Sequence, residues 1–266
     1  MNRFAADWLS LREHFDTNAR DIVNDVADAF DGLPSLIVVD LACGAGATRR
    51  ALGAHLPMPQ HWRLFDNDLS LLARAATPPA PAGSTIKTIP VDLMHDLEAA
   101  LDSGPDLITT SALLDLVSEE WLERLVIECA ARNLPLYAAL TYNGEVAFDP
   151  VDRFDTSIIT AVNKHQTSDK GFGPALGADA AKALITRCKA VGFTVIDGAS
   201  DWIIGPEDRE MQSAVLTQWA QTAQATGGDA QKIAAWFARR REFVANGGST
   251  LRVGHRDVFA RPTQTR

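Results

Sequence analysis

An unbroken apolar run followed by small residues and a helical pattern marks the most informative stretch of the chain. The run at residues 36–39 predicts a strand that is buried on both faces of a parallel sheet. Asp40 follows it, and the turn after Asp40 contains Gly44 and Gly46. From Ala47 on, apolar positions recur at helical spacing. Glycines let a ligand approach the backbone, and a helix N-terminus offers free N–H groups, so this strand–turn–helix unit predicts a ligand site.

Further strands alternate with amphipathic helices along the chain. Short apolar runs with polar ends predict strands at residues 62–65, 86–91, 106–111, 136–142, 192–202 and 250–260. The segments between most of them carry apolar residues at helical spacing, and a pair of helices is expected before the last strand. Such alternation is typical of a parallel sheet with helices on both faces, so we expect an α/β protein.

The spacing of the glycines distinguishes two classes of nucleotide-binding turn. A dinucleotide-binding turn needs a third glycine for close packing of helix on strand, and this chain has Arg49 at that position. The stretch Asp40–Gly46, D-L-A-C-G-A-G, resembles motif I of the class I S-adenosylmethionine-dependent methyltransferases. For the turn alone, the alternative is a tight strand–helix connection that binds no ligand.

Polar residues at the next strand ends extend this resemblance. Asp66 lies about 20 residues beyond the glycines, where a carboxylate can accept hydrogen bonds from ribose hydroxyls. In the family, the end of the third strand contacts the adenine amino group, and the end of the fourth faces the methyl group. The resemblance thus implies a cofactor site made by Asp40, Ala42, Gly44, Gly46, Asp66, Asn67, Asp92, Leu93, Ser111 and Arg20.

The N-terminal segment, residues 1–33, is expected to form a helical lid. An apolar stripe begins at Phe4, and Arg12, Asp16 and Arg20 follow one another at intervals of four residues. This spacing is typical of a solvated helix face with ion pairs. The alternative, which places Arg20 among the cofactor residues, is a lid whose arginine holds the cofactor carboxylate.

A long segment after the fifth strand, residues 143–178, is expected to cover the acceptor side of the site. It combines an apolar helical face with a glycine-rich loop, and it is long for a plain connection. His165 is a candidate base because its unperturbed pKa lies near neutrality, and Asp115 beyond the fourth strand is the alternative. Lys170 is the third candidate catalytic residue. For His165 and Lys170, the alternative is helix-end capping and an exposed turn.

Composition limits the partners and the compartment. The 266 residues are expected to form a single domain, residues 1–266, with 46% hydrophobic residues to fill its core. A net charge of -9 without a basic block argues against a nucleic-acid or anionic-membrane partner, and no apolar run is long enough to span a bilayer. The three scattered cysteines are typical of buried thiols in a reducing cytoplasm, and the histidines show no metal-ligand spacing.

The resemblance implies a class I methyltransferase fold, with a mostly parallel, doubly wound sheet of seven strands. It also implies methyl transfer from S-adenosyl-L-methionine to a small-molecule acceptor, with S-adenosyl-L-homocysteine as the product. A nicotinamide-dependent oxidoreductase on a Rossmann-like sheet is the second interpretation, opposed by the missing third glycine. A protein that binds S-adenosylmethionine without catalysis is the third.

Overall fold

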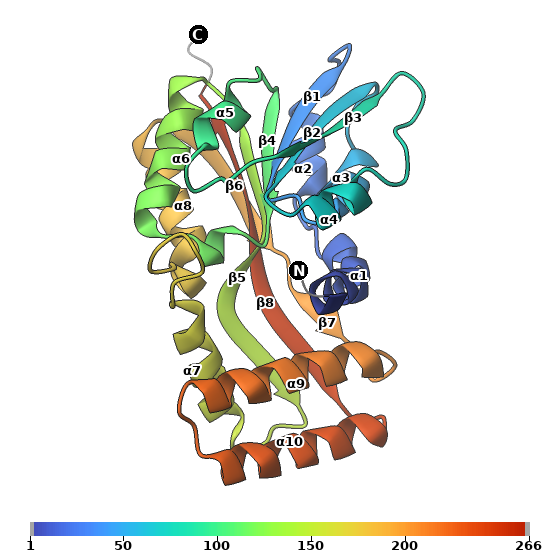
Figure 1. The fold of residues 1–266 in the computed structure, drawn as a ribbon, viewed down its shortest axis with the longest axis vertical. Coiled ribbons are helices and arrows are strands. Elements are labelled where there is room, and N and C mark those ends of the chain that lie inside the picture. The colour runs from blue at the N-terminus through green and yellow to red at the C-terminus, as the bar shows by residue number, and fades with distance from the viewer. Residues whose placement is uncertain (1–2, 264–266) are drawn as a thin grey trace.

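A twisted β-sheet runs through the whole computed structural model of the chain (Figure 1). Residues 3–263 are described, with side chains from residue 7 onward, so the side chain of Phe4 and residues 1–2 and 264–266 lie outside the described part. The strands in chain order are β1 (Leu36–Leu41), β2 (Gln60–Asp66), β3 (Thr85–Pro90), β4 (Leu107–Ser111), β5 (Leu136–Asp149), β6 (Phe193–Ala199), β7 (Trp202–Ile204) and β8 (Thr250–Pro262).

The strand order confirms the predicted doubly wound sheet. Seven strands are hydrogen-bonded in the order β3-β2-β1-β4-β5-β8-β6, and within residues 3–263 the short β7 is an eighth strand that pairs with β8. Strands β1 to β5 are mutually parallel, whereas β8 is antiparallel to β5, β6 and β7. The sheet is therefore mostly parallel, with its antiparallel strands at one side.

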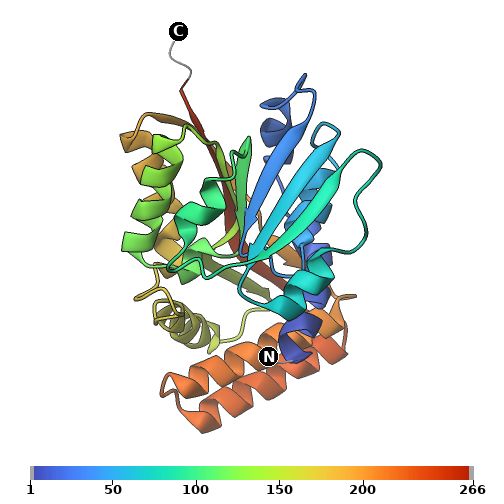
Figure 2. The same cartoon turned by 45° about the horizontal axis from the view of Figure 1, so that its top comes forward.

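Helices cover both faces of the sheet, as Figure 2 shows. Helices α5, α6 and α8 bury one apolar cluster against the sheet, and α2, α3 and α4 bury the other. The helices are α1 (Arg3–Asn18), α2 (Val23–Asp28), α3 (Ala47–Gly53), α4 (Leu69–Ala75), α5 (Leu97–Leu101), α6 (Glu119–Ala131), α7 (Asp155–Gln166), α8 (Ala180–Ala190), α9 (Arg209–Ala225) and α10 (Ala230–Ala245).

Strand β1 lies at the centre of both clusters, as its apolar run predicts. Val38 faces the cluster beneath α2 and α3, while Val39 and Leu41 face the cluster beneath α5 and α6. All three side chains are fully buried. A strand with apolar residues on both faces is fixed in register from both sides, and this fixes the turn that follows it.

Strand β5 is longer than the sequence pattern predicts. It continues seven residues past the expected end at Tyr142 and pairs with β8 as far as Asp149. Asn143 and Gly144 end the mostly apolar, fully buried run of residues 136–142. Beyond them, Val146 and Phe148 turn toward the core between exposed neighbours. The segment after the fifth strand therefore begins at residue 150 and not at 143, and α7 is its helix.

The predicted sixth strand, residues 192–202, is divided into two strands in the structure. Strand β6 ends at Ala199, and β7 starts at Trp202 after a break at Ser200 and Asp201. The carboxylate of Asp201 accepts the backbone N–H of His255 at 3.1 Å and pairs with Arg252. At the break, this side chain therefore replaces a backbone hydrogen bond between the strands. The break lets β7 pair with a different part of β8.

The paired ends of β5 and β8 extend beyond the parallel sheet as a two-stranded ribbon. Helices α7, α9 and α10 form a cap on this ribbon (Figure 1). Helices α9 and α10 pack side by side, and α7 packs on α9. A buried ion pair between Arg240 of α10 and Asp155 of α7 ties the cap together, and Asp155 also accepts the indole N–H of Trp236 at 2.8 Å. Arg240 stacks over Phe148 of the ribbon, with its guanidinium carbon 4.1 Å from the ring centroid.

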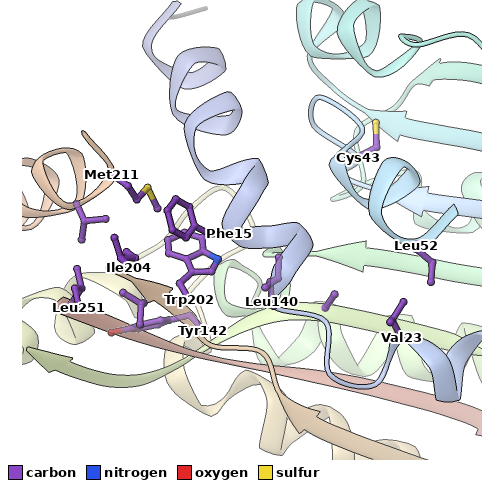
Figure 3. Close-up of a cluster of buried hydrophobic side chains, with 14 of the residues drawn as sticks. Phe15, Val23, Cys43, Leu52, Leu140, Tyr142, Trp202, Ile204, Met211 and Leu251 are labelled. Atoms are coloured by element: carbon purple, nitrogen blue, oxygen red, sulfur yellow. The ribbon is translucent and has the colours of Figure 1, made fainter. Parts of the chain in front are cut away.

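Helix α1 lies between this cap and the glycine turn. Phe15 packs beside Trp202 in the cluster around Met211 and Tyr142 (Figure 3). The indole N–H of Trp202 donates to the carboxylate of Asp16 at 3.0 Å. The N-terminal helix is thus fastened to β7, more than 180 residues away in the sequence.

We expect Asp155→Ala to lower the free energy of unfolding by about 3–5 kcal/mol, because it leaves the buried guanidinium of Arg240 without its anion. Urea unfolding followed by tryptophan fluorescence measures the loss. The control is Glu145→Ala, which breaks a mostly exposed pair with Arg252 and should change the same quantity by no more than about 0.5 kcal/mol. Equal losses in the two variants would contradict this account of the cap.

Candidate functional site

A cavity of about 250 Å³ lies at the carboxyl ends of β1, β2 and β3. This is the edge at which open α/β sheets bind ligands. Five of the residues that the resemblance assigns to the cofactor line it together: Ala42, Asp66, Asn67, Asp92 and Leu93. The structure thus brings side chains from three strand ends into one small space.

Asp66 fixes the glycine turn from the neighbouring strand. Its Oδ2 accepts the backbone N–H of Gly44 at 2.8 Å, and its Oδ1 accepts the backbone N–H of Asp68 at 2.9 Å. Asp68 in turn caps α4 through the backbone N–H groups of Ser70 and Leu71. Each carboxylate oxygen has a second lone pair, so Asp66 can hold the turn and still accept a bond from a ligand.

The two glycines of the turn have different surroundings. A side chain on Gly46, whose φ is +81°, would lie 3.0 Å from the Cα of Ala75 in α4. A side chain on Gly44, whose φ is +53°, would meet only Leu9 of α1, at 3.7 Å. A glycine is therefore required at position 46 because α4 packs closely against it. Close approach of a cofactor is not needed to explain Gly46.

Arg20 and Asp40 form a buried polar group beneath the glycine turn. The interpretation of Asp16 and Arg20 as a solvated face is wrong, because they expose only 5% and 6% of their surface. Arg20 donates its Nε–H to the carbonyl of Asp16 at 2.9 Å, and its two terminal nitrogens find no hydrogen-bond partner within residues 3–263. Its charge interacts with the buried Tyr137 and Asp257, which raise the pKa of Arg20 against the effect of burial.

Asp40 is fully buried at the end of β1. Its Oδ1 accepts the hydroxyl of Thr109 at 2.9 Å, and its Oδ2 has no partner in the described chain. Burial raises the pKa of this carboxyl to about 7, and the bond from Thr109 and the charge of Arg20 offset part of that rise. A buried carboxylate with a free oxygen is well suited to a cation.

A second cavity, of about 330 Å³, lies between the sheet edge, α1 and the cap. Asp115, His165 and Lys170, the three predicted catalytic residues, all line it. Lys170 also lines the cavity at Asp66 and Asp92, so this side chain lies between the two cavities. The other five predicted cofactor residues line neither cavity: Arg20, Asp40, Gly44, Gly46 and Ser111.

Asp115 occupies the most enclosed position of the three candidates. It is 5% exposed, its Oδ2 lies 3.5 Å from the amide nitrogen of Gln166, and its Oδ1 has no partner within residues 3–263. Burial raises the pKa of this carboxyl to about 6. Asp115 is therefore mostly ionised at neutral pH but close enough to its pKa to exchange a proton.

His165 and Lys170 lie against each other at the end of α7. The ammonium nitrogen of Lys170 is 3.2 Å from Nδ1 of His165. Burial and the charge of Lys170 lower the pKa of His165, and burial lowers the pKa of Lys170. The imidazole is therefore kept neutral. Both side chains line the cavity, and Lys170 also donates to the carbonyl of His165 at 3.1 Å, which is the helix-end capping of the alternative interpretation.

His255 is a cavity residue that the sequence did not single out. It lies on β8, 5% exposed, with its ring centroid 4.7 Å from that of Trp202. Burial and the charge of Arg12 lower its pKa to about 3, so it stays neutral, and its Nδ1 has no partner in the described chain. The available signal was a histidine in the last predicted strand, between Gly254 and Arg256, but nothing local linked it to the site.

Strained backbone gathers at the two cavities. Four non-glycine residues between 3 and 263 have positive φ, and three of them line one cavity or the other: Ala42, Ala112 and Leu140, with φ of 53°, 51° and 52°. They follow β1, follow β4 and lie within β5, in that order. Such conformations cost about 1–3 kcal/mol each and cluster at functional sites.

Other classes of site were also sought. Among the described residues, no group of three His, Cys, Asp or Glu side chains is arranged to hold a metal ion. The three cysteines are free and buried, as predicted. No helix within residues 3–263 has the length and the apolar content that crossing a membrane requires.

Comparison with known proteins identifies the fold. No protein-family model matches the sequence, and no curated protein matches it. The structure is similar to a cyclopropane-fatty-acyl-phospholipid synthase-like protein from Lactobacillus casei, with a TM-score of 0.52 and 14% identity over 94% of this chain and 91% of that one. The mycobacterial cyclopropane synthase MmaA2 from Mycobacterium tuberculosis gives 0.48 and 11%, over 90% and 82% of the two chains.

The similarity to the Lactobacillus casei protein defines the class of architecture. Together with the strand order, it shows that this chain has the class I methyltransferase fold. At such low identity the likeness concerns the fold alone, so the activity has to be argued from the residues of the two cavities.

The two glycines give a direct test of the turn. We expect Gly46→Ala to destabilise the protein by about 2–4 kcal/mol, since it adds a clash with α4 to the strain of a left-handed backbone. Gly44→Ala should cost about 1–2 kcal/mol, from backbone strain alone. Thermal and urea unfolding of both variants measure the difference. A larger loss for Gly44→Ala would contradict the packing described.

Proposed function

We propose that this protein transfers a methyl group from S-adenosylmethionine to a small-molecule acceptor. The observation that carries the proposal is the pair of cavities at the carboxyl edge of a class I methyltransferase sheet, with Lys170 lining both. One cavity has the polar strand ends suited to a nucleoside, and the other is enclosed by the cap. The net charge of -9 supports a small acceptor rather than a nucleic acid.

The residues of the first cavity fit an adenosine group. Asp66 has lone pairs for ribose hydroxyls, and Asp92 can accept a hydrogen bond from the adenine amino group. Leu93 and Ala42 offer apolar contact for the base. These four residues would hold the nucleoside half of the cofactor.

The buried polar group beneath the turn suits the amino-acid half. The two unpartnered nitrogens of Arg20 fit a carboxylate, and the free oxygen of Asp40 fits an ammonium group. S-adenosylmethionine supplies an electrophilic methyl group on a positively charged sulfur. Buried polar atoms without partners cost free energy, so a ligand that pairs with both residues would relieve this cost.

The residues of the second cavity then have to orient an acceptor and receive a proton. An acceptor atom forms its new bond to the methyl carbon while the carbon–sulfur bond breaks and leaves its electron pair on sulfur. Asp115 is the better placed base, because it is enclosed and has a free oxygen, and His165 is the alternative. Enclosure by α1, α7 and α9 keeps the acceptor in line, and positioning of this kind supplies much of the acceleration.

The cofactor assignment predicts a binding preference. Calorimetry should show S-adenosylmethionine and S-adenosylhomocysteine binding with micromolar affinity, which corresponds to about -8 kcal/mol. NADH should not bind, since Arg49 occupies the third glycine position and its side chain donates to the carbonyls of Thr77 and Pro78. Tight binding of NADH without binding of S-adenosylmethionine would favour the oxidoreductase instead.

Asp92→Ala should weaken S-adenosylhomocysteine binding about tenfold, through the lost bond to adenine. The control is Asp96→Ala, an exposed carboxylate of the same loop that lies outside the cavity, and its effect should stay within about twofold. Equal effects of the two substitutions would remove Asp92 from the site.

The raised pKa of Asp40 predicts how binding depends on pH. Below its pKa of about 7 the carboxyl is mostly protonated and cannot pair with an ammonium group. The affinity for S-adenosylhomocysteine should therefore rise about 25-fold between about pH 5.5 and 7.5, since each unit below the pKa removes a factor of about ten from the ionised fraction. Calorimetry across this range should give a flat profile for Asp40→Asn. The same slope in both proteins would exclude Asp40 as its origin.

A further inference from the structure

The second cavity has a wall of aromatic side chains. Three of the six tryptophans line it, together with Tyr142 and His255. Trp8 and Trp202 have ring centroids 6.1 Å apart, and the ring of Tyr142 lies 6.1 Å from that of His255. These rings come from α1, β5, β7 and β8, and Trp219 of α9 completes the wall. Faces and edges of several rings around one space bind a planar ring through stacked and edge-to-face contacts.

Two cationic side chains from different parts of the chain also line the second cavity. Arg12 comes from α1 and Lys170 from the loop after α7. Arg12 donates its Nε–H to Asp16 at 2.9 Å and lays its guanidinium carbon 4.9 Å from the ring centroid of Trp202. A guanidinium has five N–H donors, so this one bond does not exhaust it. The cavity therefore offers donors of positive charge beside its aromatic faces.

Negative charge in this wall is limited to one residue. Asp115 is the only carboxyl group among the described residues that line the cavity, and the amide of Gln166 lies against it. Burial raises its pKa to about 6, so it is still mostly ionised at neutral pH. The two histidines of the wall are neutral because their pKa values are lowered by burial and by neighbouring cations. Asp16, behind the wall, pairs with Arg12, so Lys170 is the lining cation that has no ion-pair partner within residues 3–263.

We infer that the acceptor is a small aromatic anion, held by its ring against Trp202 and His255 and by its charge at Arg12 and Lys170; this rests on the proposed function. A cationic acceptor would meet two like charges in an enclosed space. An aliphatic acid would satisfy the cations but would gain no ring stacking. A cavity of about 330 Å³ is at the small end of ligand sites, which fits a compound of one or two rings.

The test uses probes that separate charge from shape. The protein saturated with S-adenosylhomocysteine is titrated with 2-naphthoate, the neutral 2-naphthamide, trimethyl(2-naphthyl)ammonium and cyclohexanecarboxylate, and binding is read by calorimetry and tryptophan fluorescence. We expect 2-naphthoate to bind at least about tenfold more tightly than each of the other three, because only it offers both a ring and a negative charge. Tightest binding by the ammonium compound or by the neutral amide would overturn the inference.

Matched variants locate the charge that is recognised. Lys170→Met should weaken 2-naphthoate binding about tenfold and leave 2-naphthamide within about twofold. The control is Lys164→Met, which replaces an exposed lysine of α7 outside the cavity and should change neither affinity. An equal loss for both probes in Lys170→Met would mean a structural effect and would contradict the inference.

The two levels of the proposal fail separately. Absence of S-adenosylhomocysteine binding, measured first, would remove the proposed function. Binding of S-adenosylhomocysteine without a preference for 2-naphthoate would leave that function in place and remove only the aromatic anion.

Discussion

The antiparallel pairing of β5 with β8 beyond the parallel sheet is the constraint on which the acceptor side depends. Parallel pairing of β5 with β4 stops at Ala139, but its pairing with β8 continues to Asp149. This ribbon carries Tyr142 and His255 into the cavity and gives β7 an edge, which places Trp202. The cap helices then dock on the ribbon. Without the extended ends of β5 and β8, the first cavity at the carboxyl edge of the sheet would have no second, enclosed cavity beside it.

Half of the cofactor residues proposed from local sequence line the cavity at the ends of β1, β2 and β3, namely Ala42, Asp66, Asn67, Asp92 and Leu93. The strand ends at Asp40, Asp66 and Asp92 follow short apolar runs, and parallel pairing brings such ends together at one edge. The geometry of the turn was less predictable, since the reason for Gly46 lies in α4 and not in a ligand. The burial of Arg20 was also missed, because its four-residue spacing from Asp16 is the same on an exposed helix and a buried one.

The acceptor side could be predicted only in part. His165, Lys170 and Asp115 were found from their chemistry, and they do line one cavity. Its aromatic wall was not predicted, because Trp8 and Trp202 meet through packing between segments almost 200 residues apart. The strand pair β5–β8, on which Trp202 is placed through β7, was also incompletely predicted, because the fifth strand was expected to end at Tyr142. Non-local contacts of this kind leave no periodic signal in the sequence.

The central claim is that the two cavities hold a methyl donor and its acceptor side by side. A crystal structure of the protein with S-adenosylhomocysteine tests it most directly. The account predicts the adenosine between Asp66 and Asp92, the amino-acid end at Arg20 and Asp40, and the sulfur facing the cavity lined by Asp115 and His255. A ligand bound elsewhere, or a sulfur that faces away from the aromatic cavity, would contradict it.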